Sequence, residues 1–328
     1  MRTLRRILVA IKDPTSRYLP AVMKAAQLAR ASGAQIELFH GITTPVYANV
    51  FPHAQRSVTE FERETREHCL AALERVADQV RAHGLKVTVS SDWDFPAYEA
   101  IVRRANRIKA DLIVAERHAG PRLAPWLLHL TDWELMRLSP APVLLVKSAR
   151  PYRRPVVLAA IDPGHAFAKP AKLDRKILQA GSLVSEALRG TLHVMHAYVP
   201  VPLIPMTPGV MSADLTASMA AEALGKARTA FARALRAVKI PAGRRHLIGR
   251  YPIDAIQDLA RETRSAIVVM GAVSRSGLKR VFIGNTAERV LDQLTCDVLV
   301  VKPPRFVSRI ARTPRGVRLV ASGLPMPY

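Results

Sequence analysis

The second half of the chain repeats the strand and helix pattern of the first half. In each half, short apolar runs are separated by longer segments whose apolar residues recur at helical spacing. Corresponding pieces also match in sequence. Lys109–Val114 matches Arg264–Val269, and Pro142–Lys147 matches Asp297–Lys302. Two copies are too few for a solenoid, so the pattern predicts a domain of about 145 residues duplicated in tandem.

The apolar runs are rich in β-branched residues and do not alternate with polar ones, which is typical of parallel strands covered on both faces. Strands that alternate with helices along the chain indicate a parallel sheet. The sequence therefore predicts an α/β protein with two tandem, doubly wound, five-stranded parallel-sheet domains. Strands are expected at residues 7–11, 35–40, 86–91, 112–115 and 143–146, and again at 156–161, 191–197, 245–248, 266–270 and 298–301.

Changes in composition suggest where the domains begin and end. We expect the first domain at residues 1–147, a linker rich in Pro and Arg at 148–155, the second domain at 156–303 and a tail at 304–328. The tail carries arginines but no acidic residue, and its apolar residues follow no period. This composition predicts a flexible basic segment, either a solvated appendage or a contact site for nucleic acid and other polyanions.

The whole chain is strongly basic, with 49 Lys and Arg against 26 Asp and Glu and a net charge of +23. Such a charge favours phosphates and nucleic acid, but the basic residues are scattered, so a solvated surface is the simpler interpretation. No apolar run is long enough to span a bilayer, and the run at 7–11 is too short for a signal peptide. We expect a cytoplasmic protein. Cys69 and Cys296, one in each half, do not suggest a disulfide framework or a cysteine zinc site.

A glycine-bearing loop follows the strand expected at 266–270. Gly271 and Gly284 bracket this loop, which leads through Asn285 and Thr286 into an expected helix. Free N–H groups at a helix N-terminus favour anions, and glycine lets the backbone approach a phosphate closely. The loop therefore predicts an anion site. The alternative is a tight strand-to-helix turn that needs glycine and binds nothing.

With these features the chain resembles the universal stress protein family, in particular its tandem, E-type members. The resemblance covers about residues 3–303 and rests on the duplication, on Asp162 after the first strand of the second half, and on Thr131–Trp133. It also rests on the loop itself, which has Gly271, Ser274, Gly284 and Asn285 where the family has G-x2-G-x9-G-[ST]. The resemblance implies flavodoxin-like domains of the adenine-nucleotide-hydrolase type.

The resemblance also implies an adenine nucleotide in the second domain, ATP or AMP, with Mg²⁺ accompanying ATP. Ile161 and Asp162 would border adenine and ribose, and Ala197 would lie beside adenine. The phosphate path would be lined by Met270, Gly271, Ser274, Gly284, Asn285 and Thr286. Ser274 in place of the second glycine and Asn285 in place of Ser or Thr are departures from the family pattern.

The first domain lacks the glycine pair. Its matching segment places Glu116 where it would repel phosphate, and Pro121 and Pro125 remove N–H donors. We predict no nucleotide site there and a structural role for Asp13. His40, His193 and His196 are interpreted as core or rim residues. No catalytic residue and no metal-ligand set is identified.

The resemblance implies a stress-response binding protein that supports survival under stress, including DNA damage. It also implies pairing of the two domains within the chain and a homodimer. Three alternatives remain: slow ATP hydrolysis at the same loop, binding of nucleic acid or anionic surfaces through the tail, and a non-nucleotide ligand in the pocket.

Overall fold

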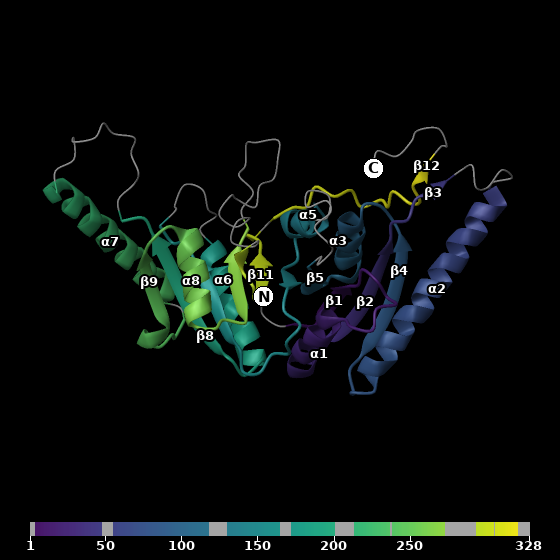
Figure 1. The fold of residues 1–328 in the computed structure, drawn as a ribbon, viewed down its shortest axis with the longest axis horizontal. Helices are drawn as coiled ribbons and strands as arrows, with labels where there is room; N and C mark the ends of the chain where they lie inside the picture. Colours follow the sequence, from purple (N-terminus) through teal and green to yellow (C-terminus); the bar gives the residue numbers. More distant parts are fainter. Residues whose placement is uncertain are drawn as a thin grey trace. The chain divides into compact units, whose positions relative to one another are not determined.

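The computed structural model describes residues 4–47, 55–117, 130–164, 172–200, 213–236, 238–272, 293–304 and 306–320. The chain forms two compact units (Figure 1). The N-terminal unit consists of Leu4–Pro151 and Val307–Tyr328, and the C-terminal unit of Tyr152–Phe306 with Met1–Thr3. Each unit follows one half of the duplicated sequence, but the chain returns to the N-terminal unit at Val307.

Among the described residues, the main sheet of the N-terminal unit has five parallel strands in the order β4-β2-β1-β5-β6. Strand β1 lies at the centre because the chain adds strands first on one side of it and then on the other. The strands are β1 (Arg6–Ala10), β2 (Gln35–Ile42), β4 (Val87–Trp93), β5 (Leu112–Glu116) and β6 (Val143–Val146). The helices are α1 (Pro20–Ser32), α2 (Gln55–Arg81), α3 (Ala97–Ile108) and α5 (Leu130–Leu138).

The C-terminal unit repeats this topology in the order β11-β10-β7-β8-β9, again with parallel pairs. Its strands are β7 (Val156–Ile161), β8 (Thr191–Tyr198), β9 (Arg245–Gly249), β10 (Ile267–Gly271) and β11 (Asp297–Val301). Its helices are α6 (Leu173–Ala187), α7 (Ala213–Leu235) and α8 (Pro252–Glu262), with a short 3-10 helix at Ala242–Arg244. The predicted pair of doubly wound, five-stranded parallel sheets is confirmed.

Each core is built from the β-branched and aliphatic runs of the central strands. Ile7, Leu8 and Val9 of β1 are fully buried, as are Val157, Leu158 and Ala159 of β7. Burial on both faces follows from right-handed crossovers, which place the helices after β1 and β2 on one face and those after β4 and β5 on the other. Accordingly, α1 packs against β1 and β5, and α3 against β1 and β2.

The segment after the second repeat makes specific contacts within the N-terminal unit. Residues 307–320 belong to the N-terminal unit, where Arg315 forms an ion pair with Glu99. Strand β12 (Leu319–Val320) pairs in parallel with β3 (Val46–Tyr47), and these two short strands form a second sheet. The sequence gives no sign of these contacts, because an ion pair and a two-residue bridge leave no apolar period.

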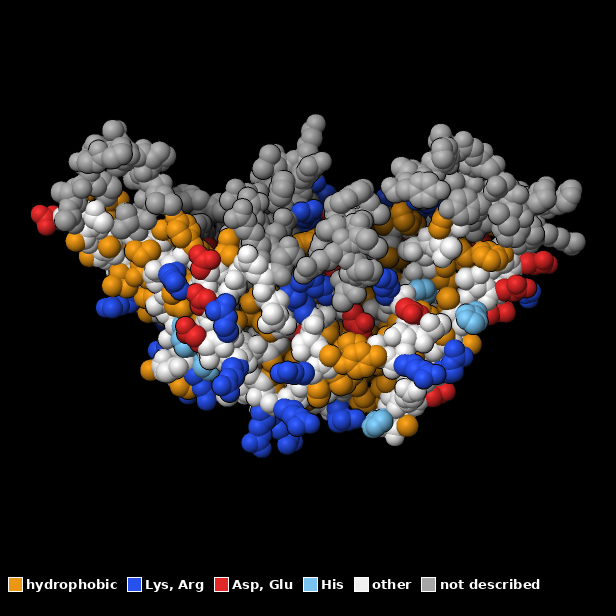
Figure 2. Space-filling view, viewed as in Figure 1, with side chains coloured by type: hydrophobic (Ala, Val, Ile, Leu, Met, Phe, Trp, Pro, Cys, Tyr) orange, Lys and Arg blue, Asp and Glu red, His pale blue; other side chains and the backbone are white. Residues whose placement is uncertain are grey.

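Basic side chains are distributed over both units rather than gathered in one stripe on the face shown in Figure 2. Acidic and apolar side chains lie between them on the same face. Among the helices in the described ranges, none is both long enough and apolar enough to cross a membrane. On the face shown in Figure 2, the charge excess therefore does not mark a binding surface.

Candidate functional site

The topological switch point of the C-terminal sheet lies between β7 and β10. The chain leaves β7 for β8 on one side and later returns to β10 on the other. In open α/β sheets, ligands bind outside the carboxyl ends of the strands at such a point, because the connecting loops diverge there and leave a crevice. A ligand site is therefore expected at this edge of the C-terminal sheet.

The strand register brings most of the described candidate residues to this edge. Val269 lies opposite Ala159, and continuing that parallel register places Gly271 beside Ile161. On the other side of β7, Ile161 lies opposite His196, so Ala197 is one residue further along β8. The structure thus brings together Ile161, Asp162, Ala197, Met270 and Gly271. Ser274, Gly284, Asn285 and Thr286 lie outside the described residues.

Asp162 is fixed through its backbone while its carboxylate faces solvent in part. Its N–H donates to Asp174 Oδ1 of α6 over 3.0 Å. Its side chain is 38% exposed, and Oδ1 lies 4.0 Å from Nδ1 of the buried His196. Anchoring the backbone limits the positions that this carboxylate can take. It is therefore a pre-positioned acceptor at the carboxyl edge of the sheet.

His196 and His40 occupy the same place in the two repeats. His196 Nδ1 lies 3.3 Å from the carbonyl oxygen of Ile161, and His40 Nδ1 lies 2.9 Å from that of Ile11. Because a carbonyl can only accept, Nδ1 carries the proton in both rings. Each histidine therefore secures the end of the first strand of its own unit. Aligning the two repeats at these histidines would have revealed this role from sequence.

Gly271 is required by packing between α6 and β10. A Cβ at this position would lie 2.6 Å from Leu173 Cδ2 and 2.9 Å from Leu173 Cγ. Leu173 is the first residue of α6 and is fully buried, so it has little room to move. The first glycine of the loop motif therefore has a structural reason in addition to the expected approach to phosphate.

The N-terminal unit carries a carboxylate at the corresponding switch point. Ala10 lies opposite Ala115, which places Glu116 beside Ile11. Glu116 Oε1 accepts a hydrogen bond of 2.9 Å from the N–H of Ala21 in the first turn of α1. Burial raises the pKa of Glu116, and the bond from Ala21 opposes that shift. The protein's own carboxylate thus takes the place that an anion would occupy at this helix N-terminus.

Asp13 has a local structural role. Its Oδ1 accepts hydrogen bonds from the Thr15 N–H at 2.9 Å and from the Thr15 hydroxyl at 2.6 Å. The bond from the hydroxyl, followed by that from the backbone, lowers the pKa of Asp13. The carboxylate therefore stabilises the turn that follows β1.

Two further features of the described residues bear on possible ligands. A groove of about 950 Å³ lies between α1, α2 and the loop before α1, with Arg17, Arg30 and Arg75 among its lining residues. It belongs to the N-terminal unit and is not formed by the candidate residues above. Within the described ranges, no cluster of three or more His, Cys, Asp or Glu side chains is arranged to hold a metal ion.

The family model and the most similar known proteins indicate the same family for this chain. The model of the universal stress protein family matches residues 3–147 and again residues 157–302. Universal stress protein E of Escherichia coli (strain K12) is 28% identical over 320 residues, covering 93% of this chain and 96% of that protein. Universal stress protein E of Photorhabdus laumondii is 25% identical over 309 residues, covering 93% of this chain and 97% of that protein.

Solved structures agree in fold. A putative universal stress protein from Pseudomonas aeruginosa UCBPP-PA14 is 27% identical with a TM-score of 0.69, covering 92% of this chain and 94% of that chain. A universal stress protein from Archaeoglobus fulgidus DSM 4304 has the same fold at 18% identity, with a TM-score of 0.60 over 90% of this chain and 98% of that chain. The duplicated architecture is thus shared over nearly the full length.

Proposed function

The chain belongs to the universal stress protein family, and on that premise we propose that its C-terminal unit binds an adenine nucleotide, ATP or AMP. The proposed site is the carboxyl edge of β7 and β10. We further propose a cytoplasmic stress-response protein that supports survival under stress such as DNA damage. It acts by binding rather than by metabolic catalysis, and Mg²⁺ accompanies the nucleotide when the nucleotide is ATP.

The observation that carries the proposal is the convergence at the switch point. Ile161 ends β7 and Asp162 follows it directly, while Met270 and Gly271 end the neighbouring parallel strand β10. Ala197 reaches the same edge from β8. These residues come from three strands separated by long connections. Their meeting at the place where this fold binds ligands supports a site there.

The side chains at this edge suit the adenosine part of a nucleotide. Ile161 and Met270 are buried apolar side chains, 4% and 5% exposed, and provide an apolar floor for a base. The Asp162 carboxylate has two acceptor oxygens, which matches the two hydroxyl donors of a ribose. In the proposal, Ser274, Gly284, Asn285 and Thr286 contact the phosphates, and Mg²⁺ neutralises phosphate charge.

The N-terminal unit is proposed not to bind nucleotide. Glu116 places a carboxylate at its switch point and already accepts the N–H of Ala21. A phosphate would have to displace this carboxylate and would be repelled by it. The proposal therefore predicts one nucleotide for each chain.

Mass spectrometry of small molecules released from the native purified protein tests the proposal. After incubation with ATP and removal of free nucleotide, we expect ATP or AMP in the released fraction. Gly284→Val should abolish recovery, because a branched side chain would block the proposed phosphate path. The matched control is Gly243→Val, at an exposed position where an added Cβ would have nothing within 4 Å. No nucleotide from the unaltered protein, or equal recovery from Gly284→Val, contradicts the proposal.

We also propose that the protein forms a homodimer, as the family resemblance implies. Light scattering coupled to size-exclusion chromatography should give twice the chain mass of 36.1 kDa. A mass equal to that of one chain over the accessible concentration range contradicts this part of the proposal.

A further inference from the structure

A buried cluster of charged side chains lies at the junction of β4 and α3 in the N-terminal unit. Arg103 of α3 forms ion pairs with Asp94 and with Glu99. The three side chains are between 3% and 8% exposed. Two carboxylates and one guanidinium leave the cluster one positive charge short of neutrality. An unbalanced buried charge is costly, so the cluster favours an additional cation.

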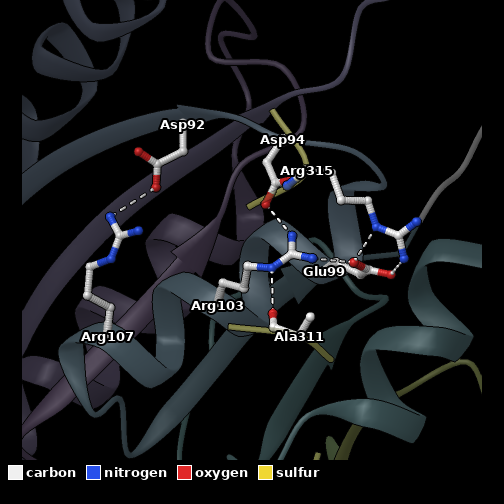
Figure 3. A network of polar contacts seen from close by, with 7 residues as sticks. All are labelled: Asp92, Asp94, Glu99, Arg103, Arg107, Ala311 and Arg315. Carbon is white, nitrogen blue, oxygen red and sulfur yellow. Dashed lines mark hydrogen bonds and ion pairs between the residues drawn. The ribbon is translucent and has the colours of Figure 1, made fainter. Parts of the chain in front are cut away.

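Arg315 of the C-terminal segment supplies this cation (Figure 3). Its Nη2 donates to Glu99 Oε1 at 2.6 Å, and its Nε donates to Glu99 Oε2 at 3.0 Å. This is a two-point contact between guanidinium and carboxylate, a geometry that Lys cannot reproduce. The N–H of Arg315 also donates to Asp94 Oδ1 at 2.9 Å.

Other contacts extend the docking on both sides of Arg315. The carbonyl oxygen of Ala311 accepts a hydrogen bond of 2.8 Å from Arg103 Nε. The guanidinium of Arg318 lies over the Phe95 ring, 5.2 Å from its centroid. Beyond it, Leu319 and Val320 pair with Val46 and Tyr47 of β3. The segment therefore binds as an extended peptide, by an arginine contact and the addition of a short strand.

This docking leaves much of the segment in contact with water. The Arg315 side chain is 63% exposed, whereas Glu99 is 8% exposed. Val307 is 81% exposed, and Arg309 and Arg312 are exposed as well. Segments with few buried apolar contacts open at low free-energy cost, and a solvent-facing ion pair weakens with salt. The contact is specific in geometry but open to competition by ions.

We propose that Asp94, Glu99 and Arg103 form a docking site for an arginine-bearing extended peptide, and that the chain's own residues 307–320 occupy this site reversibly. In the docked state Arg315 neutralises the cluster and β12 covers the edge of β3. In the released state the acidic site and the β3 edge become accessible, and the Arg315 guanidinium no longer contacts Glu99. The site thus couples exposure of an acidic face to release of a basic segment.

Hydrogen–deuterium exchange of the full chain tests this proposal. Arg315→Ala should increase exchange in the peptide covering residues 310–320 by about tenfold, because it removes a charge-assisted two-point contact. Arg312→Ala is the matched control, since it removes the same charge from an exposed position of the same segment. It should leave the exchange unchanged. Arg315→Lys should be intermediate, because it keeps the charge but loses the two-point geometry.

Salt dependence provides the second readout. Raising salt from about 0.01 M to about 1 M shortens the screening length from about 30 Å to about 3 Å. Exchange of the segment should rise several-fold in the unaltered protein and much less in Arg315→Ala. Exchange in β1 and β5 should stay constant, which separates release from unfolding. Equal exchange in Arg315→Ala and Arg312→Ala, or a segment insensitive to salt, overturns the proposal. So does release that occurs only together with unfolding of the N-terminal unit.

Discussion

The hydroxyl of Tyr152 donates a hydrogen bond of 2.5 Å to Oδ2 of Asp297 inside the C-terminal unit. Asp297 is fully buried at the start of β11, and Tyr152 lies in the segment before β7. Burial, followed by the Asp297 charge, raises the pKa of Tyr152 well above its usual value. The tyrosine therefore remains a hydrogen-bond donor across the physiological pH range. Its bond connects the segment before β7 to the start of β11.

Tyr152→Phe should lower the free energy of unfolding by about 1–3 kcal/mol, because a buried carboxylate loses a hydrogen-bond donor. Urea denaturation measures the change. Tyr251→Phe, at a position 47% exposed in the same unit, serves as the control and should stay within about 0.5 kcal/mol. Equal stability of the two variants would show that the buried bond contributes little.

A stacked histidine pair on β8 and β9 should make stability depend on pH. His193 Nδ1 and His246 Nε2 are 3.0 Å apart, and the ring planes differ by 9°. Burial lowers the pKa of both histidines, and the charges of His246 and Arg244 lower that of His193 further. Because the unfolded chain takes up protons more readily, stability is full above about pH 6.5 and falls as the pH decreases through the lowered pKa values.

His246→Gln should therefore reduce the loss of stability between about pH 7.5 and pH 5. Urea midpoints at several pH values measure this loss. His68→Gln, at an exposed position on α2, should retain the pH dependence of the unaltered protein. If both variants show the same slope, the pair is not a source of the pH dependence.

Substitutions at Glu116 test its contact with the first turn of α1. Glu116→Ala should destabilise the N-terminal unit by about 0.5–2 kcal/mol, the usual effect of losing a helix N-cap. Glu116→Gln keeps an oxygen acceptor and removes a charge whose pKa is raised by burial. It should be at least as stable as the unaltered protein near pH 7, because a raised carboxyl pKa means that stability is lost as the pH rises through it. Chemical denaturation measures the stability of both variants. An equal loss of stability in Glu116→Ala and Glu116→Gln would contradict the role of Glu116 as an acceptor for the first turn of α1.

Two glycine substitutions should change the stability of the protein in opposite directions. Gly271→Ala should destabilise by about 1–3 kcal/mol because its Cβ would overlap Leu173. Gly225→Ala lies within α7 with nothing within 4 Å of the added Cβ, so it should stabilise by about 0.5–1 kcal/mol through helix propensity. Thermal unfolding compares them. A neutral Gly271→Ala would mean that α6 moves away from β10 at little cost.

Most of the fold follows from local sequence signals. Runs such as Val156–Ile161 and Val143–Val146 are long enough and apolar enough to identify buried strands, and the observed bounds agree. The duplication then fixes the topology, because the second half must repeat the first. The positions of Ile161, Asp162 and Gly271 at one edge follow from that topology.

The remaining features depend on contacts between residues far apart in the chain. Glu99 and Arg315 are separated by 216 positions, and nothing in either local sequence indicates their pairing. The two-residue strands β3 and β12 are too short for a detectable period. The overlap that makes Gly271 necessary involves Leu173 on another element. In each case the cause is a contact between distant parts of the chain, which a periodic pattern does not encode.

Calorimetric titration of the full chain with ATP and AMP is the sharpest test of the proposed nucleotide site. We predict saturable binding of one nucleotide per chain and a loss of affinity of at least about tenfold in Asp162→Ala, since a ribose hydroxyl bonded to a carboxylate contributes about 1.5–3 kcal/mol. Asp13→Ala, in the turn after the first strand of the other repeat, should bind as tightly as the unaltered protein. Absence of binding, two nucleotides per chain, or equal affinity in Asp162→Ala would contradict a single adenine-nucleotide site at the edge of β7 and β10.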